Sequence, residues 1–249
     1  MSQGSHVSAS GRITRGISPN TFVNETIKFV ENQLHVWRDD KRRPYVEAEE
    51  DLNGQLCKFL NDRARDDFPM ALFQHEERQG KRRRIDLSVL PSSKAIVAAI
   101  YESIYEPFLV IEGKRLPAPS KGREREYLTG FDKKSGGIQR FRLCLHGKSL
   151  VAAVMVGYVQ TSEVEDWLMT INGWIAALKS SGEDKTCVWS DQDQLGELQN
   201  DGKARASRCE SRHLRLGDVP EVRLTHLWIC MAQEGNRTAR KQKPSQRRA

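Results

Sequence analysis

Apolar side chains recur at helical spacing in three long stretches of the chain, residues 20–38, 46–62 and 162–179. In the first stretch they lie three or four positions apart, at Phe22, Val23, Ile27, Val30, Leu34 and Trp37. This spacing predicts amphipathic helices with one buried face each. Ser162 and the acidic residues after it predict a capped start for the third helix.

Shorter apolar runs, several of them rich in β-branched residues, alternate with these helices. Residues 69–76 and 83–90 flank a Gln-Gly-Lys turn and predict a β-hairpin. Residues 108–116 and 150–159 predict two further strands, and 224–231 predicts a last strand added to the sheet edge or packed against the third helix. The pattern favours a mixed α/β fold built on one sheet.

Between these runs the chain has room for two more elements. Residues 92–106 separate two predicted strands by more than a tight hairpin needs, so they form an inserted strand or a short helix. Residues 136–145 begin with a Gly-Gly pair and predict a helix that ends near Leu145. The predicted order is therefore helix, three strands, helix, strand, with an additional helix before it and a helix and strand after it.

Length and composition set wider limits. The 249 residues suit one domain over residues 19–233, flanked by predicted disordered segments at 1–18 and 234–249. No uninterrupted apolar run is long enough to span a bilayer, and the first sixteen residues contain no apolar core of a signal peptide. We therefore expect a cytoplasmic protein without a membrane partner, whose five scattered cysteines are free thiols.

The positive charge is concentrated at the C-terminal end. The net charge is +7, and six basic residues after Glu234 leave the rest of the chain near +1. Such a tail attracts phosphate without sequence preference, or simply keeps the protein soluble. Both interpretations remain open.

Three charged residues interrupt the predicted strands where buried apolar residues are expected. Asp86 lies within the second strand, and Glu112 and Lys114 lie two residues apart near the end of the third. Alternate residues of a strand point to one face, so Glu112 and Lys114 project together. Two carboxylates form a hard oxygen site for Mg²⁺ or Mn²⁺, and a neighbouring lysine can orient an attacking water. This combination is typical of phosphodiester hydrolysis.

The residues Asp86, Glu112 and Lys114, in this order of elements, resemble the PD-(D/E)XK, or restriction-endonuclease-like, nuclease superfamily. Ile85 stands where that signature often has proline. The resemblance covers about residues 47–160 and implies an αβββαβ core. It also implies a metal-dependent nuclease in which Asp86, Glu112, the Gly113 carbonyl and an acid of the first core helix hold Mg²⁺ or Mn²⁺.

Two further site residues follow from the resemblance. Glu49 is the acid nearest the apolar stripe of its helix and is the candidate for the metal site, whereas a first-turn acid that complements the helix dipole is the alternative. Gln139 is the candidate that supplements the active site from the next helix. A solvent-facing helix start is the alternative for Gln139 and for its neighbour Arg140.

Candidate contacts to nucleic acid are the basic residues close to these elements. The cluster at residues 81–84 directly precedes the strand of Asp86, although charge runs are usually solvated turns. The candidates are Arg83, Arg84, Arg123 and Arg140. His75, His146, His213 and His226 have no metal-type spacing and receive no chemical role.

The sequence therefore predicts a Mg²⁺- or Mn²⁺-dependent deoxyribonuclease acting in phage defence, restriction or repair. No Walker-type motif occurs, so control would come from an ATPase or sensor protein in trans. A homodimer is the general expectation for an oligomer. Two alternatives are a catalytically inactive subunit of the same fold that binds nucleic acid or a partner, and an RNA-cleaving toxin.

Overall fold

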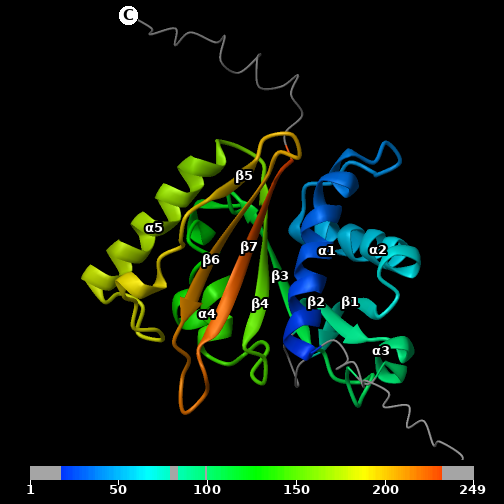
Figure 1. Ribbon diagram of the computed structural model, residues 1–249. Helices are drawn as coiled ribbons and strands as arrows, with labels where there is room; N and C mark the ends of the chain where they lie inside the picture. Colours follow the sequence, from blue (N-terminus) through cyan, green and yellow to red (C-terminus); the bar gives the residue numbers. More distant parts are fainter. Residues whose placement is uncertain (1–17, 79–83, 99, 232–249) are drawn as a thin grey trace, which may run out of the picture.

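The computed structural model describes residues 18–78, 84–98 and 100–231 and contains a seven-stranded mixed sheet with helices on both faces (Figure 1). The strand order is β1-β2-β3-β4-β7-β6-β5. β1, β2 and β3 are antiparallel neighbours, β3, β4 and β7 are parallel, and β6 and β5 continue antiparallel. The mixed α/β class expected from the sequence is confirmed.

From α1 to α5 the elements follow the order that the apolar pattern predicts, and two unpredicted strands, β5 and β6, precede β7. The helices are α1 (Pro19–Asp39), α2 (Glu49–Asp67), α3 (Ser93–Val97), α4 (Gly137–Arg142) and α5 (Val164–Ser181), with short 3₁₀ turns at Lys121–Arg123, Phe131–Lys133 and Asp191–Asp193. The strands are β1 (Ala71–Arg78), β2 (Arg84–Pro91), β3 (Leu109–Leu116), β4 (Ala152–Val159), β5 (Gln199–Asp201), β6 (Ala206–His213) and β7 (Val222–Cys230). The insertion between β2 and β3 contains the short helix α3. The predicted disordered ends lie outside the described residues, except for Ser18, whose hydroxyl caps α1.

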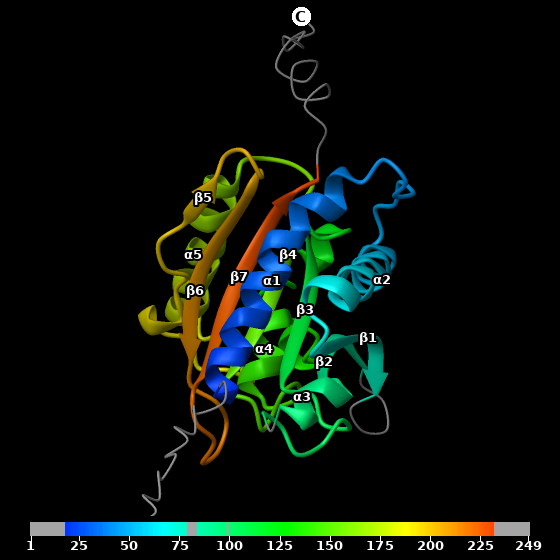
Figure 2. The same ribbon diagram turned by 45° about the vertical axis from the view of Figure 1, so that its right-hand side comes forward.

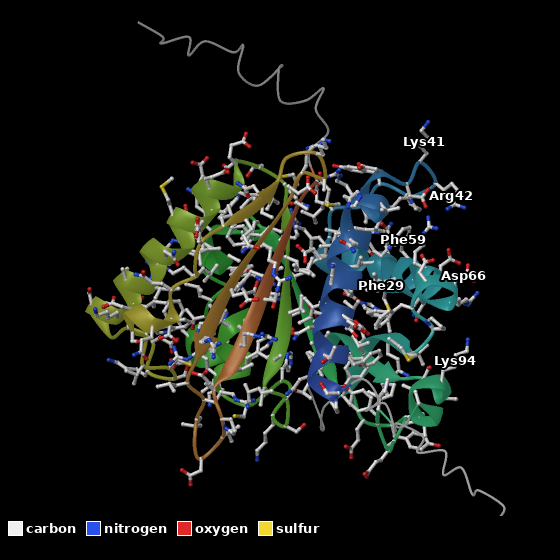
Figure 3. The ribbon with its side chains drawn as sticks, viewed as in Figure 1. Phe29, Lys41, Arg42, Phe59, Asp66 and Lys94 are labelled. Atoms are coloured by element: carbon white, nitrogen blue, oxygen red, sulfur yellow. The ribbon has the colours of Figure 1, made fainter. Side chains whose placement is uncertain are left out.

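Two apolar layers fix the helices to the sheet. α1 and α2 pack on one face with the inward residues of β3, β4 and β7, and α4 and α5 pack on the other (Figure 2). Figure 3 shows Lys41, Asp66 and Lys94 on the outside of the first layer. Phe29, by contrast, stacks on Phe68 within it, with ring centroids 5.1 Å apart. No described helix combines the length and apolar character that crossing a membrane requires.

The last strand corrects one expectation. β7 lies inside the sheet between β4 and β6, not at its edge, whereas its packing with α5 is as expected, because Val222, Leu224 and Trp228 lie in the apolar layer of α5. The sequence did not reveal β6, because burial alternates along Ala206–His213 but the buried residues are mostly polar and form no apolar pattern. The start of α5 also differs: Glu163 is its N-cap, and Ser162 has a left-handed backbone with φ of 64°.

A buried hydrogen-bonded chain joins β6 and β7 to the α4 layer. It runs from Asp193 through His213, Ser211, His226 and Tyr127 to Trp228, with successive distances of 2.7 to 2.9 Å. The Asp193 carboxylate can only accept and the Trp228 indole can only donate, so every hydrogen points one way and both histidines are neutral. Burial lowers the pKa of His226 to about 3, and it also lowers the pKa of His213.

This chain predicts a histidine-dependent loss of stability in acid. A histidine whose folded pKa is depressed stabilises the fold fully above its unfolded pKa near 6.5, and this contribution is lost as the pH falls toward 3. Urea unfolding of the wild type and of His226→Asn isolates the contribution, because other titrating groups cancel in the comparison. Between about pH 4 and pH 6 we expect the wild type to lose up to about 1.4 kcal/mol per pH unit more than the variant. Parallel pH profiles would contradict the assignment.

Candidate active site

Four predicted site residues meet at the end of β3. The Lys114 Nζ lies 2.7 Å from Glu49 Oε1, 3.0 Å from Glu112 Oε1 and 3.9 Å from Asp86 Oδ2. Glu49 is the first residue of α2, Asp86 belongs to β2, and Glu112 and Lys114 share one face of β3. Three carboxylates from separate elements therefore surround one ammonium group.

The strands β2 and β3 separate where these side chains gather. Their register has three pairs and stops at Leu87 and Ile111. Beyond that point the Gly113 amide donates to Asp86 Oδ2 at 2.9 Å, and the Arg115 amide donates to Glu49 Oε2 at 3.2 Å. Beyond the last β2–β3 pair, the carboxylates of Asp86 and Glu49 accept the β3 amide hydrogens that β2 no longer pairs. Leaving these amides without a partner would cost free energy.

Gly113 leaves no space for a side chain. A Cβ atom there would lie 2.0 Å from Asn53 Oδ1, and that oxygen accepts a 2.7 Å hydrogen bond from the Tyr158 hydroxyl. Because Asn53 is buried and held by Tyr158, it cannot move aside without losing that bond. Glycine therefore allows α2 to approach β3 closely enough for Glu49 to reach Lys114.

Gly113→Ala is expected to lower the free energy of unfolding by about 1–3 kcal/mol because of overpacking. Urea unfolding measures the change. Gly173→Ala is the matched control, since no atom lies within 4 Å of its built Cβ and α5 should gain about 0.5–1 kcal/mol. Equal stability changes in the two variants would contradict the close contact.

Glu112 carries the most constrained charge of the cluster. Its side chain has no exposed surface, and its Oε1 contacts both Lys114 and the Arg140 Nη1, the latter at 2.5 Å. Burial alone raises the pKa of Glu112, but Lys114, His146 and Arg140 together outweigh it and hold the pKa below its usual range. The pKa of Lys114 is raised above its usual value, because its acidic neighbours outweigh its burial.

Asp86 responds in the opposite way. Burial and the Glu112 charge raise the pKa of Asp86 to about 7, despite the nearby Lys114. Near neutral pH this carboxyl is therefore partly protonated. An added positive charge beside it would favour the ionised form.

The donor set suits a hard divalent cation. Carboxylate oxygens of Asp86, Glu112 and Glu49 are the ligands that Mg²⁺ and Mn²⁺ prefer, and Glu112 Oε2 is a buried oxygen without a hydrogen-bond partner. In the described part of the chain no three acidic, histidine or cysteine side chains form a ready metal cluster. The Lys114 ammonium lies among the acids instead. The Gly113 carbonyl faces the same gap as its amide, as expected for a strand residue.

The helix after β3 contributes a different residue from the expected one. Gln139 is fully buried and bonds away from the carboxylates, to the amides of Gly130 and Gly136, the Phe131 carbonyl and the Thr186 hydroxyl. This corrects its expected role in the active site, because its amide fixes the preceding loop. Arg140 is the α4 side chain that reaches Glu112.

The other predicted basic contacts lie outside this cluster. Arg123 pairs with Glu126 at 2.6 Å and is half exposed. Arg83 lies outside the described residues, and only the backbone of Arg84, in β2, is described. The structure therefore brings Arg140 alone of these four into contact with the predicted catalytic residues among the side chains that it describes.

One site residue has no counterpart in the sequence prediction. His146 Nδ1 lies 3.2 Å from Glu112 Oε2, and the imidazole is 1% exposed. α4 ends at Arg142, earlier than the predicted Leu145, and the left-handed Cys144 turns the chain so that the His146 amide donates to the Arg140 carbonyl. A lone histidine 34 positions from its partner gives no spacing signal.

Comparison with known proteins gives no further guide to function. No protein-family model, curated protein or solved structure matches this chain. The arrangement of the site residues is the basis for the functional proposal.

Proposed function

We propose that this protein is a metal-dependent nuclease that hydrolyses DNA phosphodiester bonds in the cytoplasm. The observation that carries the proposal is the convergence of Glu49, Asp86, Glu112 and Lys114 where β2 and β3 separate. The run α2-β1-β2-β3-α4-β4, interrupted by the short helix α3 between β2 and β3, has three antiparallel strands followed by a parallel one and supports a restriction-endonuclease-like core.

The chemistry assigns one role to each residue. Asp86 and Glu112, with the Gly113 carbonyl and with Glu49 through water, would hold Mg²⁺ or Mn²⁺, which lowers the pKa of bound water and stabilises charge on the phosphate. Lys114 orients the attacking water. The water oxygen would bond to phosphorus as the bond to the 3′ oxygen breaks. The proton that the water loses passes to solvent, and the 3′ oxygen takes up a proton from solvent. Arg140, one quarter exposed, offers its guanidinium to a phosphate oxygen.

DNA is the proposed substrate because the resembling superfamily acts mostly on it. A role in phage defence, restriction or repair, regulation by an ATPase or sensor in trans, and homodimerisation belong to the same proposal. The basic segment after Glu234 adds phosphate attraction that does not depend on sequence.

Cleavage assays test the proposal. Supercoiled, linear and single-stranded DNA are incubated with Mg²⁺ or Mn²⁺, with EDTA as a control. We expect metal-dependent products from the wild type and from Asp191→Asn, which changes an exposed acid, and a loss of at least about 10²-fold in Asp86→Asn. Intact DNA under every condition, or equal rates in the two variants, would overturn the proposal.

A second candidate is an inactive subunit that uses the same fold to bind nucleic acid. The observation that favours it is the full burial of Glu112, whose charge is neutralised by Lys114 and Arg140. Under this alternative the cluster only stabilises the fold, so DNA binding would be independent of divalent cations and unaffected by Asp86→Asn. Filter binding with and without Mn²⁺ separates the two candidates.

A further inference from the structure

Two buried polar atoms face each other beside the catalytic cluster. Glu112 Oε2 and His146 Nδ1 lie 3.2 Å apart, at ion-pair distance, but their contact lacks hydrogen-bond geometry and neither atom has another hydrogen-bond partner within the described structure. Their side chains are 0% and 1% exposed. The other carboxylate oxygen, Oε1, already contacts Lys114 and Arg140. A buried polar atom without a hydrogen bond costs free energy, and an ion bound by both atoms would satisfy both at once, which their direct contact does not.

Their separation fits two neighbouring ligands of one metal ion. Histidine nitrogen and carboxylate oxygen bind a first-row divalent ion at about 2.0–2.2 Å. At these bond lengths, ligands at a right angle lie about 3.0 Å apart and ligands at a tetrahedral angle about 3.4 Å apart. The observed 3.2 Å lies between these values.

The local structure holds the imidazole in place. The amides of Leu145 and His146 both donate to the Arg140 carbonyl, at 2.8 and 3.4 Å. The ring packs edge-on against Phe141, with centroids 6.1 Å apart. A ligand held in this way loses little conformational freedom on binding.

We infer that His146 Nδ1 and Glu112 Oε2 are joint ligands of the catalytic cation, and that the site therefore prefers Mn²⁺ or a later transition ion to Mg²⁺. This inference rests on the proposed metal-dependent function. Imidazole nitrogen suits transition ions, whereas Mg²⁺ favours oxygen ligands and retains its waters. Asp86, water and the substrate phosphate complete the coordination.

Calorimetric titration of the full chain with MnCl₂ and with MgCl₂ tests this assignment. We expect His146→Asn to weaken Mn²⁺ binding by about 10–100-fold and to change Mg²⁺ binding by less than about 3-fold. His75→Asn is the matched control, because it removes an exposed imidazole of β1 that makes none of the contacts described for the cluster, and it should change neither affinity.

The outcomes separate this inference from the proposed function. If Glu112→Gln abolishes Mn²⁺ binding and His146→Asn does not weaken it, the histidine ligand is wrong and the nuclease proposal stands. If the wild type binds neither ion, both fail. Pulsed electron paramagnetic resonance of Mn²⁺ bound to the wild type gives a second readout that needs no variant. Nitrogen coupling from a directly bound imidazole supports the assignment, and its absence overturns it.

Discussion

Glu112→Gln is expected to abolish divalent-cation binding and to lower the rate of DNA cleavage by about 10³-fold or more. Glu112 is the fully buried carboxylate of the cluster, and the amide that replaces it is neutral and a weaker ligand. Lys114 keeps Glu49 as its partner at 2.7 Å, so the fold should persist while the site loses its central charge. Titration calorimetry and initial cleavage rates measure the two losses.

Glu221→Gln provides the matched control for this variant. It makes the same chemical change at an exposed glutamate that pairs only with Arg212 among the interactions described for it. Binding and cleavage should remain at wild-type values. If Glu112→Gln retained cleavage within a few fold of Glu221→Gln, Glu112 would have no catalytic role.

Lys114→Met is expected to lower the free energy of unfolding by about 3–5 kcal/mol in metal-free buffer. The variant removes the buried ammonium between Glu49, Asp86 and Glu112 and leaves their charges facing one another. A divalent cation can take over this neutralising role. Mn²⁺ should therefore recover much of the loss in urea unfolding, although cleavage stays impaired because no ammonium orients the water.

Lys179→Met serves as the control for Lys114→Met. Lys179 pairs with Asp191 at the surface, and breaking such a pair typically changes stability by less than about 1 kcal/mol. Stabilisation by Mn²⁺ of the same size in Lys114→Met, Lys179→Met and wild type would contradict a cation site at Lys114.

The sequence could predict the centre of the site because strand periodicity is local. Glu112 and Lys114 are two residues apart in a strand, so their shared face follows from the pleat alone. Glu49 followed from its place on the apolar stripe of a helix. The burial of these charged residues within apolar runs marked them before any tertiary contact was known.

The rest of the site depends on information that local pattern does not contain. Neighbouring helix residues point about 100° apart, so the sequence could not decide whether Gln139 or Arg140 faces Glu112 in a helix of six residues. The contact of His146 depends on where that helix ends and on the left-handed turn at Cys144. Both are set by tertiary packing.

The same limit applies to the sheet. β7 was recognised as a strand, but its place between β4 and β6 depends on a neighbouring strand whose sequence is mostly polar. The buried side of β6 is mostly polar, at Ser207, Ser211 and His213, so this strand carries almost no apolar signal. The position of β6 in the sheet is set by its hydrogen bonding to β7, which is a tertiary contact that the local sequence does not show.

Anomalous diffraction from crystals of the wild-type protein soaked in Mn²⁺ would test the central claim most directly. The account predicts one anomalous peak within about 2.0–2.4 Å of carboxylate oxygens of both Asp86 and Glu112, with Lys114 displaced from between them. A data set in which Lys114 keeps its place among the three carboxylates, with no peak beside Asp86 and Glu112, would contradict it.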